Sequence, residues 1–237
     1  MKMNKRTVII SDIHGCIDEF SEMLKLADAK SSNVRVILLG DILDRGTDSV
    51  GCIRKARELG IVSVKGNHEN KFLKWYRSAG SRSDVYDKNK FYDDLSDADI
   101  NYIMQMPYYL KIDNTIIAHA GVRPNIPLEK QSNDLMHIRY LTNKNEFISL
   151  HKVNKIGKEA AGAHYWTEDW KGPESVVYGH HVHSYKDPLI EEVAPGVMCY
   201  GLDTGCCFGG ALTGLVLETK EIIQVQAKEV YYKSDLK

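Results

Sequence analysis

Three times in the first third of the chain, a short apolar run is followed within two residues by Gly or Ser and then by an acidic or amide side chain. The runs are residues 7–10, 34–39 and 61–64. Residues 19–29 and 49–59, which lie between them, carry apolar side chains at helical spacing. This order of strand, loop and helix predicts parallel strands whose carboxyl ends meet at one edge of a sheet. The polar side chains that follow the strands should therefore lie close together.

Five short segments hold polar side chains of this kind. They are Ser11-Asp12-Ile13-His14-Gly15, Gly40-Asp41-Ile42-Leu43-Asp44-Arg45-Gly46, Gly66-Asn67-His68-Glu69, His119-Ala120-Gly121 and Gly179-His180. They supply carboxylate, amide and imidazole groups, and all contain Gly, which permits tight turns. Together, in expected strand-end positions, they predict a metal centre.

Two divalent ions a few ångströms apart need a bridging carboxylate with further ligands on either side. Asp12 and His14 stand two residues apart, so one turn can direct both at one ion. Asp41 follows the second expected strand and is placed to bridge. The second ion would take a neutral oxygen and two imidazoles that come later, those of Asn67, His119 and His180. Mixed nitrogen and oxygen ligation suits Mn²⁺, Fe or Zn²⁺ better than Ca²⁺ or Mg²⁺, and we expect two ions, with Mn²⁺ first among the three.

A centre of this kind can form a bridging hydroxide near neutral pH, which would attack phosphorus in line. Arg45 lies beyond the Asp41 loop, and a guanidinium there matches two phosphate oxygens. His68 can give a proton to a leaving alkoxide, and Asp44 is the carboxylate expected to orient it. The predicted activity is therefore two-metal hydrolysis of a phosphoester.

The five segments resemble the pattern GDxHG, GDxxDRG, GNHE, H-G/A-G and GH of the PPP branch of the calcineurin-like metallophosphoesterases, with Ser11 in place of the first Gly. That branch includes serine/threonine phosphatases, their bacterial and phage relatives, and symmetrical diadenosine tetraphosphatases. Val182 stands where the common pattern GHxH of other metallophosphoesterases has a further His ligand. This difference favours the PPP arrangement.

The resemblance implies a role for each matched position. The first ion would be held by Asp12, His14 and Asp41, and the second by Asp41, Asn67, His119 and His180. His68 would be the acid, with Asp44 as its partner. Phosphate would be bound by Arg45 and Asn67, and also by Arg139, which lies in a segment similar to the one that carries a second phosphate-binding Arg.

The resemblance also implies an α/β fold: a two-sheet β-sandwich flanked by helices in four α-β-β-α layers. We expect residues 1–237 to form a single domain with a charged, helical insertion at about 70–110. Later strands are expected at residues 112–118, 175–178, 197–200, 211–218 and 221–232. Residues 124–172 carry little strand signal.

Two substrate classes fit these motifs. The first is phosphoserine or phosphothreonine in proteins, or small phosphomonoesters. The alternative is a dinucleoside polyphosphate, because residues 170–180 and the turn Asp203-Thr204-Gly205 look like those of the tetraphosphatase group. In that case Trp166 and Trp170 could stack on a base. A third hypothesis is a metal-binding scaffold without turnover, which would not require the acid pair or Arg45.

Composition excludes several other classes. The net charge of -1 gives no basic surface for nucleic acid, and no apolar run approaches the ~20 residues of a membrane helix. The 5 cysteines include the vicinal pair Cys206-Cys207 and do not resemble a secreted disulfide framework. We expect reduced, buried thiols in a cytoplasmic protein, with a redox-sensitive thiol as the alternative. The phosphorylated protein or nucleotide substrate is the only partner that the sequence suggests.

Overall fold

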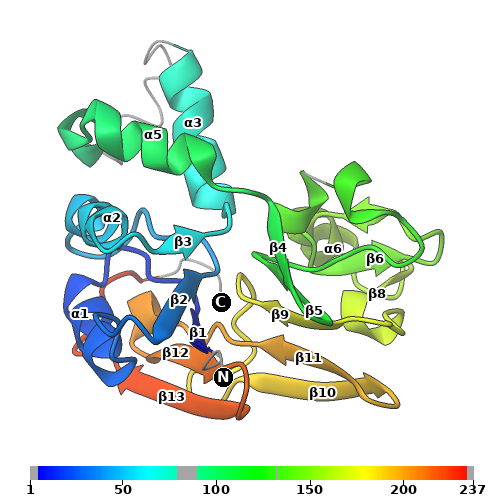
Figure 1. Cartoon of the computed structure of the whole chain (residues 1–237). Helices are drawn as coiled ribbons and strands as arrows, with labels where there is room; N and C mark the ends of the chain where they lie inside the picture. The colour runs from blue at the N-terminus through cyan, green and yellow to red at the C-terminus, as the bar shows by residue number, and fades with distance from the viewer. Residues whose placement is uncertain (1–4, 79–89, 132, 234–237) are drawn as a thin grey trace.

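The computed structural model describes residues 5–78, 90–131 and 133–233, and within them two five-stranded sheets pack face to face (Figure 1). The first sheet has the order β13-β12-β1-β2-β3 and the second β10-β11-β9-β5-β4. Ten apolar side chains, among them Ile9, Ile37, Ile117 and Val177, form the buried layer between the sheets. The chain thus has the expected α/β fold of two mixed sheets flanked by helices.

The first sheet contains the three strands expected from the opening of the sequence. Its strands are β1 (Arg6–Ile10), β2 (Val34–Leu38), β3 (Val62–Ser63), β12 (Ala211–Val216) and β13 (Glu221–Gln226). The first three run parallel, and β12 pairs antiparallel with β1 and β13. Helices α1 (Ile17–Leu26) and α2 (Ser49–Glu58) cover its outer face, where Phe20, Met23 and Ile53 are fully buried. The carboxyl ends of β1, β2 and β3 therefore lie side by side.

The second sheet brings the late motifs to the same region. Its strands are β4 (Tyr109–Ile112), β5 (Thr115–Ala118), β9 (Ser175–Tyr178), β10 (Leu189–Ala194) and β11 (Val197–Gly201). Strand β9 is parallel to both β5 and β11. His119 directly follows β5, and Gly179-His180 follows β9. Neighbouring parallel strands thus deliver both late histidines at one edge.

Short elements cover the outer face of the second sheet. They are η2 (Leu128–Lys130), η3 (Asp134–Met136), α6 (Leu150–Ile156), η4 (Trp166–Glu168) and a small sheet of β6 (Tyr140–Thr142), β7 (Phe147–Ile148) and β8 (Ala163–Tyr165). Leu135, Ile138 and Trp166 pack there against Ile116 and Val176. Residues 124–172 therefore contain a three-stranded sheet that the sequence did not predict.

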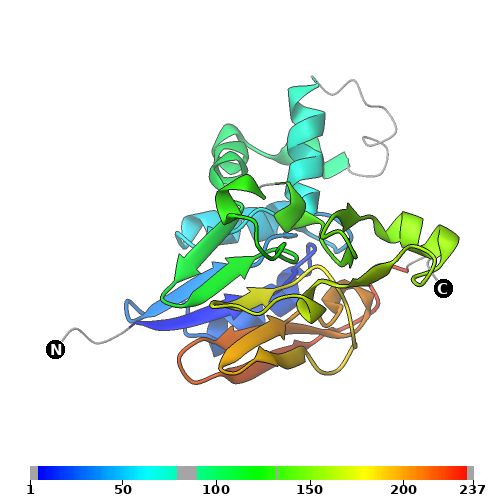
Figure 2. The same cartoon turned by 90° about the vertical axis from the view of Figure 1, so that its right-hand side faces the viewer.

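Helices α3 (Asn67–Arg77) and α5 (Asp97–Gln105), with η1 (Lys90–Asp94), project beyond the β3 edge of the first sheet (Figures 1 and 2). Helix α3 begins inside the Gly66-Asn67-His68-Glu69 motif, so the helical segment is continuous with the candidate site. Part of the expected insertion, residues 79–89, lies outside the described residues. That the whole chain is a single domain stays a prediction.

Candidate metal centre

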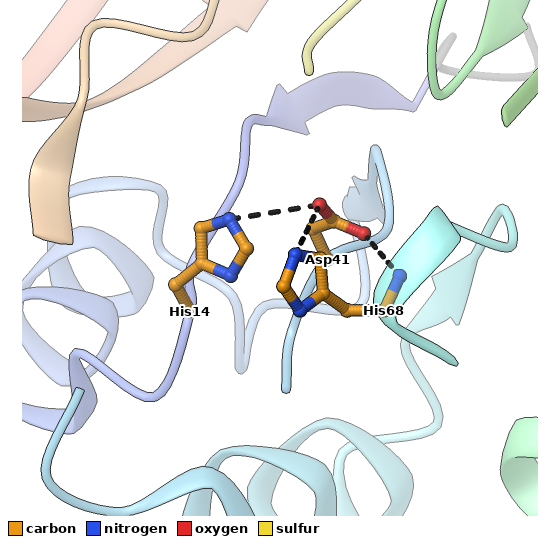
Figure 3. A group of neighbouring side chains, drawn as sticks. All are labelled: His14, Asp41 and His68. Atoms are coloured by element: carbon orange, nitrogen blue, oxygen red, sulfur yellow. Dashed lines mark hydrogen bonds and ion pairs between the residues drawn. The ribbon is translucent and has the colours of Figure 1, made fainter. Parts of the chain in front are cut away.

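The Asp41 carboxylate lies between histidines from both sheets. Its Oδ2 is 3.5 Å from His14 Nε2 and 3.8 Å from His68 Nε2, and Figure 3 shows these side chains around it. Its Oδ1 is 3.4 Å from His119 Nε2. One carboxylate thus faces imidazoles on both of its oxygens, which is the arrangement that a bridging ligand requires.

A second group of ligand atoms adjoins the Oδ1 side. His119 Nε2 lies 3.1 Å from Asn67 Oδ1 and 3.2 Å from His180 Nδ1. Asp41, His119 and His180 each place a ligand atom within 4.8 Å of the others, and so do His14, Asp41 and His68. The structure therefore brings together most of the predicted ligand set in two adjoining groups.

Backbone carbonyls fix the orientation of two of the imidazoles. His14 Nδ1 is 2.9 Å from the Leu43 carbonyl oxygen, and His119 Nδ1 is 2.7 Å from that of Leu39. Each Nδ1 carries the proton that it donates in this bond. In the neutral ring, which is the form that binds a metal, Nε2 then keeps its lone pair. Metal-binding histidines are usually oriented in this way.

Asp12 follows β1, and its carboxylate points at the backbone of the Gly179-His180 motif. Its two oxygens accept the His180 N–H at 3.0 and 3.2 Å, and Oδ1 also accepts the Ser11 hydroxyl. Burial, with the charge of Asp41, raises the pKa of Asp12 to about 6. Burial, with the charge of Asp12, raises the pKa of Asp203 to about 8.

Charge in this region fits the binding of cations. Burial would lower the pKa of His119, but Asp41 and Asp12 raise it to about 10. Asp12, Asp41 and Asp203 are all at least 92 % buried, where unpaired carboxylates are costly. Asp12 and Asp41, together with imidazole nitrogens that carry a lone pair when the ring is neutral, offer the mixed oxygen and nitrogen donors that a pair of divalent ions would take.

Several of these side chains sit on left-handed backbone. The φ values of His14, Asp41, Asp44, Arg45 and His180 are +48°, +46°, +70°, +75° and +67°. Non-Gly residues rarely adopt this conformation, and it costs about 1–3 kcal/mol where it is held. The sharp turns after β1, β2 and β9 thus aim the side chains at the centre.

Glu69 holds the Asp41 loop against α3. Its Oε2 accepts the N–H groups of Asp41 and Gly66 at 2.8 and 2.9 Å. Its Oε1 accepts those of Ile42 and Leu43 at 2.9 and 3.2 Å. Glu69 belongs to the Gly66-Asn67-His68-Glu69 motif, but no role was predicted for it from the sequence. Four backbone bonds to one fully buried carboxylate show that it fixes the loop geometry.

The predicted acid pair is in place. His68 Nδ1 lies 2.5 Å from Asp44 Oδ2, so its Nε2 points toward the centre, 3.8 Å from Asp41. Lys71 Nζ also reaches Asp44 Oδ2, at 3.0 Å. Burial opposes ionisation of Asp44, but the contacts with His68 and Lys71 outweigh it and lower the pKa of Asp44. Lys71 thus supports this carboxylate from the second turn of α3.

Arg45 and Arg139 lie on the approach to the centre. Arg45 Nη1 is 2.7 Å from His14 Nε2, and its guanidinium lies over the rings of Phe208 and Tyr232 at 5.1 and 5.6 Å. Arg139 Nη2 donates to the His180 carbonyl at 2.8 Å. Burial lowers the pKa of Arg139, and the positive charge of Arg45 adds to this effect. The two cations are therefore near enough to repel each other.

The expected base-stacking tryptophans are not available to a ligand. Trp166 is 0 % and Trp170 is 7 % exposed, and both belong to the core outside the second sheet. Trp166 packs so tightly that a Cβ at Gly121 would lie 2.5 Å from its ring. The prediction that Trp166 and Trp170 contact a ligand was wrong, because the sequence does not show on which side of the sheet these side chains pack. The contacts of Phe208 and Tyr232 with Arg45 could not be predicted, because neither residue lies in a recognisable motif.

The sequence matches a known protein family over most of its length. Residues 5–210 match the family model of the calcineurin-like phosphoesterases. The chain belongs to the calcineurin-like phosphoesterase family. It is therefore a metal-dependent phosphoesterase, and its His and Asp groups suggest a binuclear metal centre.

Relatives of this phosphoesterase cover nearly the whole chain. The asymmetrical bis(5'-nucleosyl)-tetraphosphatase PrpE of Oceanobacillus iheyensis is 28% identical over 94% of the chain and 93% of its own length. The symmetrical bis(5'-nucleosyl)-tetraphosphatase of Yersinia enterocolitica is 30% identical over 94% of the chain and 92% of its own length.

Solved structures of other proteins share the fold of this chain. One, a crystal structure of a protein provisionally assigned as a diadenosine tetraphosphatase, has a TM-score of 0.77 and 27% identity over 95% of each chain. A serine/threonine phosphatase of Saccharomyces cerevisiae, with a TM-score of 0.54 and 14% identity over the whole chain and 83% of its own, shares the fold. Within the described residues, none of the helices has the length and apolar character needed to cross a bilayer.

Proposed function

We propose that this phosphoesterase hydrolyses dinucleoside polyphosphates, of which diadenosine tetraphosphate is the reference substrate. The observation that carries this proposal is the match, over about nine-tenths of both chains, to relatives named as bis(5'-nucleosyl)-tetraphosphatases. This favours the alternative drawn from the sequence over the main expectation of a phosphoserine or phosphothreonine substrate. The serine/threonine phosphatase of Saccharomyces cerevisiae, at 14% identity, supports a likeness of fold alone.

The two arginines support a polyphosphate substrate. Arg45 and Arg139 flank the His and Asp groups and repel each other. A chain of phosphates between them would relieve that repulsion and could engage each guanidinium with two oxygens. A single phosphate monoester offers fewer oxygens for the same task.

Each catalytic group has a proposed role. Two divalent ions, Mn²⁺ first, would be held by Asp12, His14, Asp41, Asn67, His119 and His180, and would supply a nucleophilic hydroxide near neutral pH. Arg45, Arg139 and the Asn67 amide orient the phosphates. His68, as an imidazolium whose Nδ1–H is held by Asp44, gives its Nε2 proton to the leaving oxygen and is left as the neutral Nδ1–H ring.

The test is a product analysis with Mn²⁺-loaded protein and diadenosine tetraphosphate. We expect adenine nucleotides to be released, either ADP alone from symmetrical cleavage or ATP with AMP from asymmetrical cleavage. An Asp41→Asn variant should lose at least about a hundredfold in rate, because Asp41 faces both ligand groups. Intact dinucleotide after prolonged incubation, with other phosphoesters cleaved, would overturn the proposal.

A further inference from the structure

A second group of metal-type ligands lies in the core behind the phosphate-binding face. The Cys16 and Cys206 sulfurs and one Glu19 carboxylate oxygen all lie within 4.8 Å of one another. Cys16 precedes α1, Glu19 is in its first turn, and Cys206 begins η5 (Cys206–Phe208). All three side chains are at least 98 % buried, within the cluster that packs on the first sheet. We refer to them as the Cys16–Glu19–Cys206 cluster.

The surroundings of the Glu19 carboxylate are a second, independent indication of a bound ligand in this cluster. It is 0 % exposed. Its Oε1 accepts the Lys228 N–H at 2.8 Å and the Tyr231 hydroxyl at 2.7 Å. Its Oε2 is buried and has no hydrogen-bond partner among the described residues. The Lys228 ammonium pairs with Asp18 instead, at 2.6 Å.

This arrangement leaves a buried carboxylate oxygen beside two thiols in an apolar core. A buried polar atom without a partner is costly, and a buried charge without a partner costs more. Cysteine sulfurs and carboxylate oxygens are, however, both among the donors that bind Zn²⁺ in proteins. An ion bound there would give Oε2 a ligand bond and would hold both sulfurs as thiolates.

We propose that the Cys16–Glu19–Cys206 cluster binds one structural Zn²⁺ ion, separate from the binuclear centre. Structural zinc sites are generally four-coordinate. Cys16, Glu19 and Cys206 supply three of these ligands, and no further Cys, His, Asp or Glu of the described residues has a ligand atom within 4.8 Å of all three. The ion binds as the chain folds, since all its ligands are enclosed in the native core.

The position of the ion gives it a structural consequence. It joins the turn after His14, the first turn of α1 and the start of η5. The next two residues of η5, Cys207 and Phe208, contact Arg45. Glu19 also anchors the tail that places Tyr232 over the same guanidinium. The zinc therefore fixes the support of a phosphate-binding Arg without touching substrate.

The competing account contains no metal. In it, Glu19 keeps only its contacts with Lys228 and Tyr231, and the Cys16 thiol donates to the His14 carbonyl at 3.8 Å in an ordinary apolar core. The two accounts differ in whether the cysteines are thiolates bound to an ion, and this difference has a spectroscopic signature that is independent of activity.

The experiment uses the full chain loaded with Co²⁺ in place of Zn²⁺. Cobalt bound by sulfur gives an intense thiolate-to-metal charge-transfer band in the near ultraviolet, and cobalt bound by the nitrogen and oxygen ligands of the binuclear centre does not. We expect the band in the wild-type protein and its loss in Cys16→Ala and Glu19→Gln variants. The matched control is Cys199→Ala, which removes an equally buried thiol from the core outside the second sheet and should keep the band.

Metal content gives a second reading on the same preparations. After growth with zinc and dialysis against a chelator, about one zinc ion per chain should remain in the wild type and in Cys199→Ala, because a buried ion exchanges only when the core opens. The Cys16→Ala variant should retain none. A wild-type protein with no charge-transfer band and no retained zinc would overturn the proposal, even if the variants fail to fold.

Discussion

Asp41 is the residue on which the candidate centre depends, because its two oxygens face imidazoles from both sheets. His68 differs from His14 and His119, since Asp44 rather than a backbone carbonyl orients it. Its Nε2 lies 3.8 Å from Asp41 and 3.4 Å from an Arg45 nitrogen. A proton on that nitrogen lies where the phosphate would be bound, as a general acid requires.

The leaving group decides how much the His68 proton matters. An alkoxide leaving from a phosphomonoester needs protonation, whereas a nucleotide leaving from an anhydride is already a stable anion. A His68→Gln variant should therefore lose about 10²–10³-fold in kcat on a phosphoserine peptide but only about tenfold on diadenosine tetraphosphate. His164→Gln, a change at a partly exposed ring away from the centre, is the control. Equal losses on both substrates would contradict the assigned role.

At the scale of elements, the loops after β1, β2, β5 and β9 and the first turn of α3 build the site. The sequence predicted them well because each combines a short apolar run with Gly and a ligand-type side chain. Glu69 was given no role, since a carboxylate that binds backbone N–H groups of another loop leaves no local pattern. The structure shows that this one side chain sets the position of the whole Asp41 loop.

Removal of that carboxylate should loosen the loop. A Glu69→Ala variant leaves four buried N–H groups without their acceptor, so we expect the free energy of unfolding to fall by about 3–5 kcal/mol. Urea titration followed by circular dichroism measures this change. Glu58→Ala, at an exposed position at the end of α2, should change it by less than about 0.5 kcal/mol. A similar small effect at Glu69 would show that the clamp is unimportant.

Two glycines with the same left-handed backbone provide a matched pair. A Cβ at Gly40 (φ +86°) would lie 2.5 Å from the Gly66 nitrogen, whereas a Cβ at Gly60 (φ +63°) meets nothing within 4 Å. Gly60→Ala should cost about 1 kcal/mol from strain alone. Gly40→Ala should cost several times more and should also displace Asp41. Thermal unfolding of both variants checks this, and equal costs would refute the close approach of the two loops.

Other elements could not be predicted because their pattern is weak. Residues 112–118 looked like one strand, but Asp113 adopts a left-handed conformation and divides the region into the β4–β5 hairpin. Strand β10 contains Glu191 and Glu192 in a half-exposed edge position, so its apolar alternation is lost. The small sheet of β6, β7 and β8 has strands of two or three residues, too short for a periodic signal. Strand β13 ends at Gln226, before the expected 232.

At the scale of the whole molecule, the candidate centre joins the two sheets. His14 and Asp41 follow strands of the first sheet, and His119 and His180 follow strands of the second. The apolar layer between the sheets ends at these buried charged groups. Bound cations should therefore stabilise the contact between the sheets as well as supply the chemistry.

Chelation tests that coupling. Removal of the ions should lower the melting temperature, and excess Mn²⁺ should restore it. At a Mn²⁺ concentration of a hundred times the dissociation constant, binding should add about 2.7 kcal/mol to the free energy of unfolding. In an Asp41→Asn variant the response to Mn²⁺ should be much smaller. A melting temperature that is unaffected by chelator in the wild type would contradict the idea that the ions hold the sheets together.

The most direct test of the whole account is a competition in one reaction. Mn²⁺-loaded protein is given diadenosine tetraphosphate and a phosphothreonine peptide at equal concentration, and both products are followed over time, with Asp41→Asn as the control. The account predicts that the dinucleotide is consumed at least about ten times faster, which corresponds to about 1.4 kcal/mol in transition-state stabilisation, and that Asp41→Asn loses both activities together. Faster loss of phosphate from the peptide would contradict it and would favour a phosphoserine or phosphothreonine substrate instead.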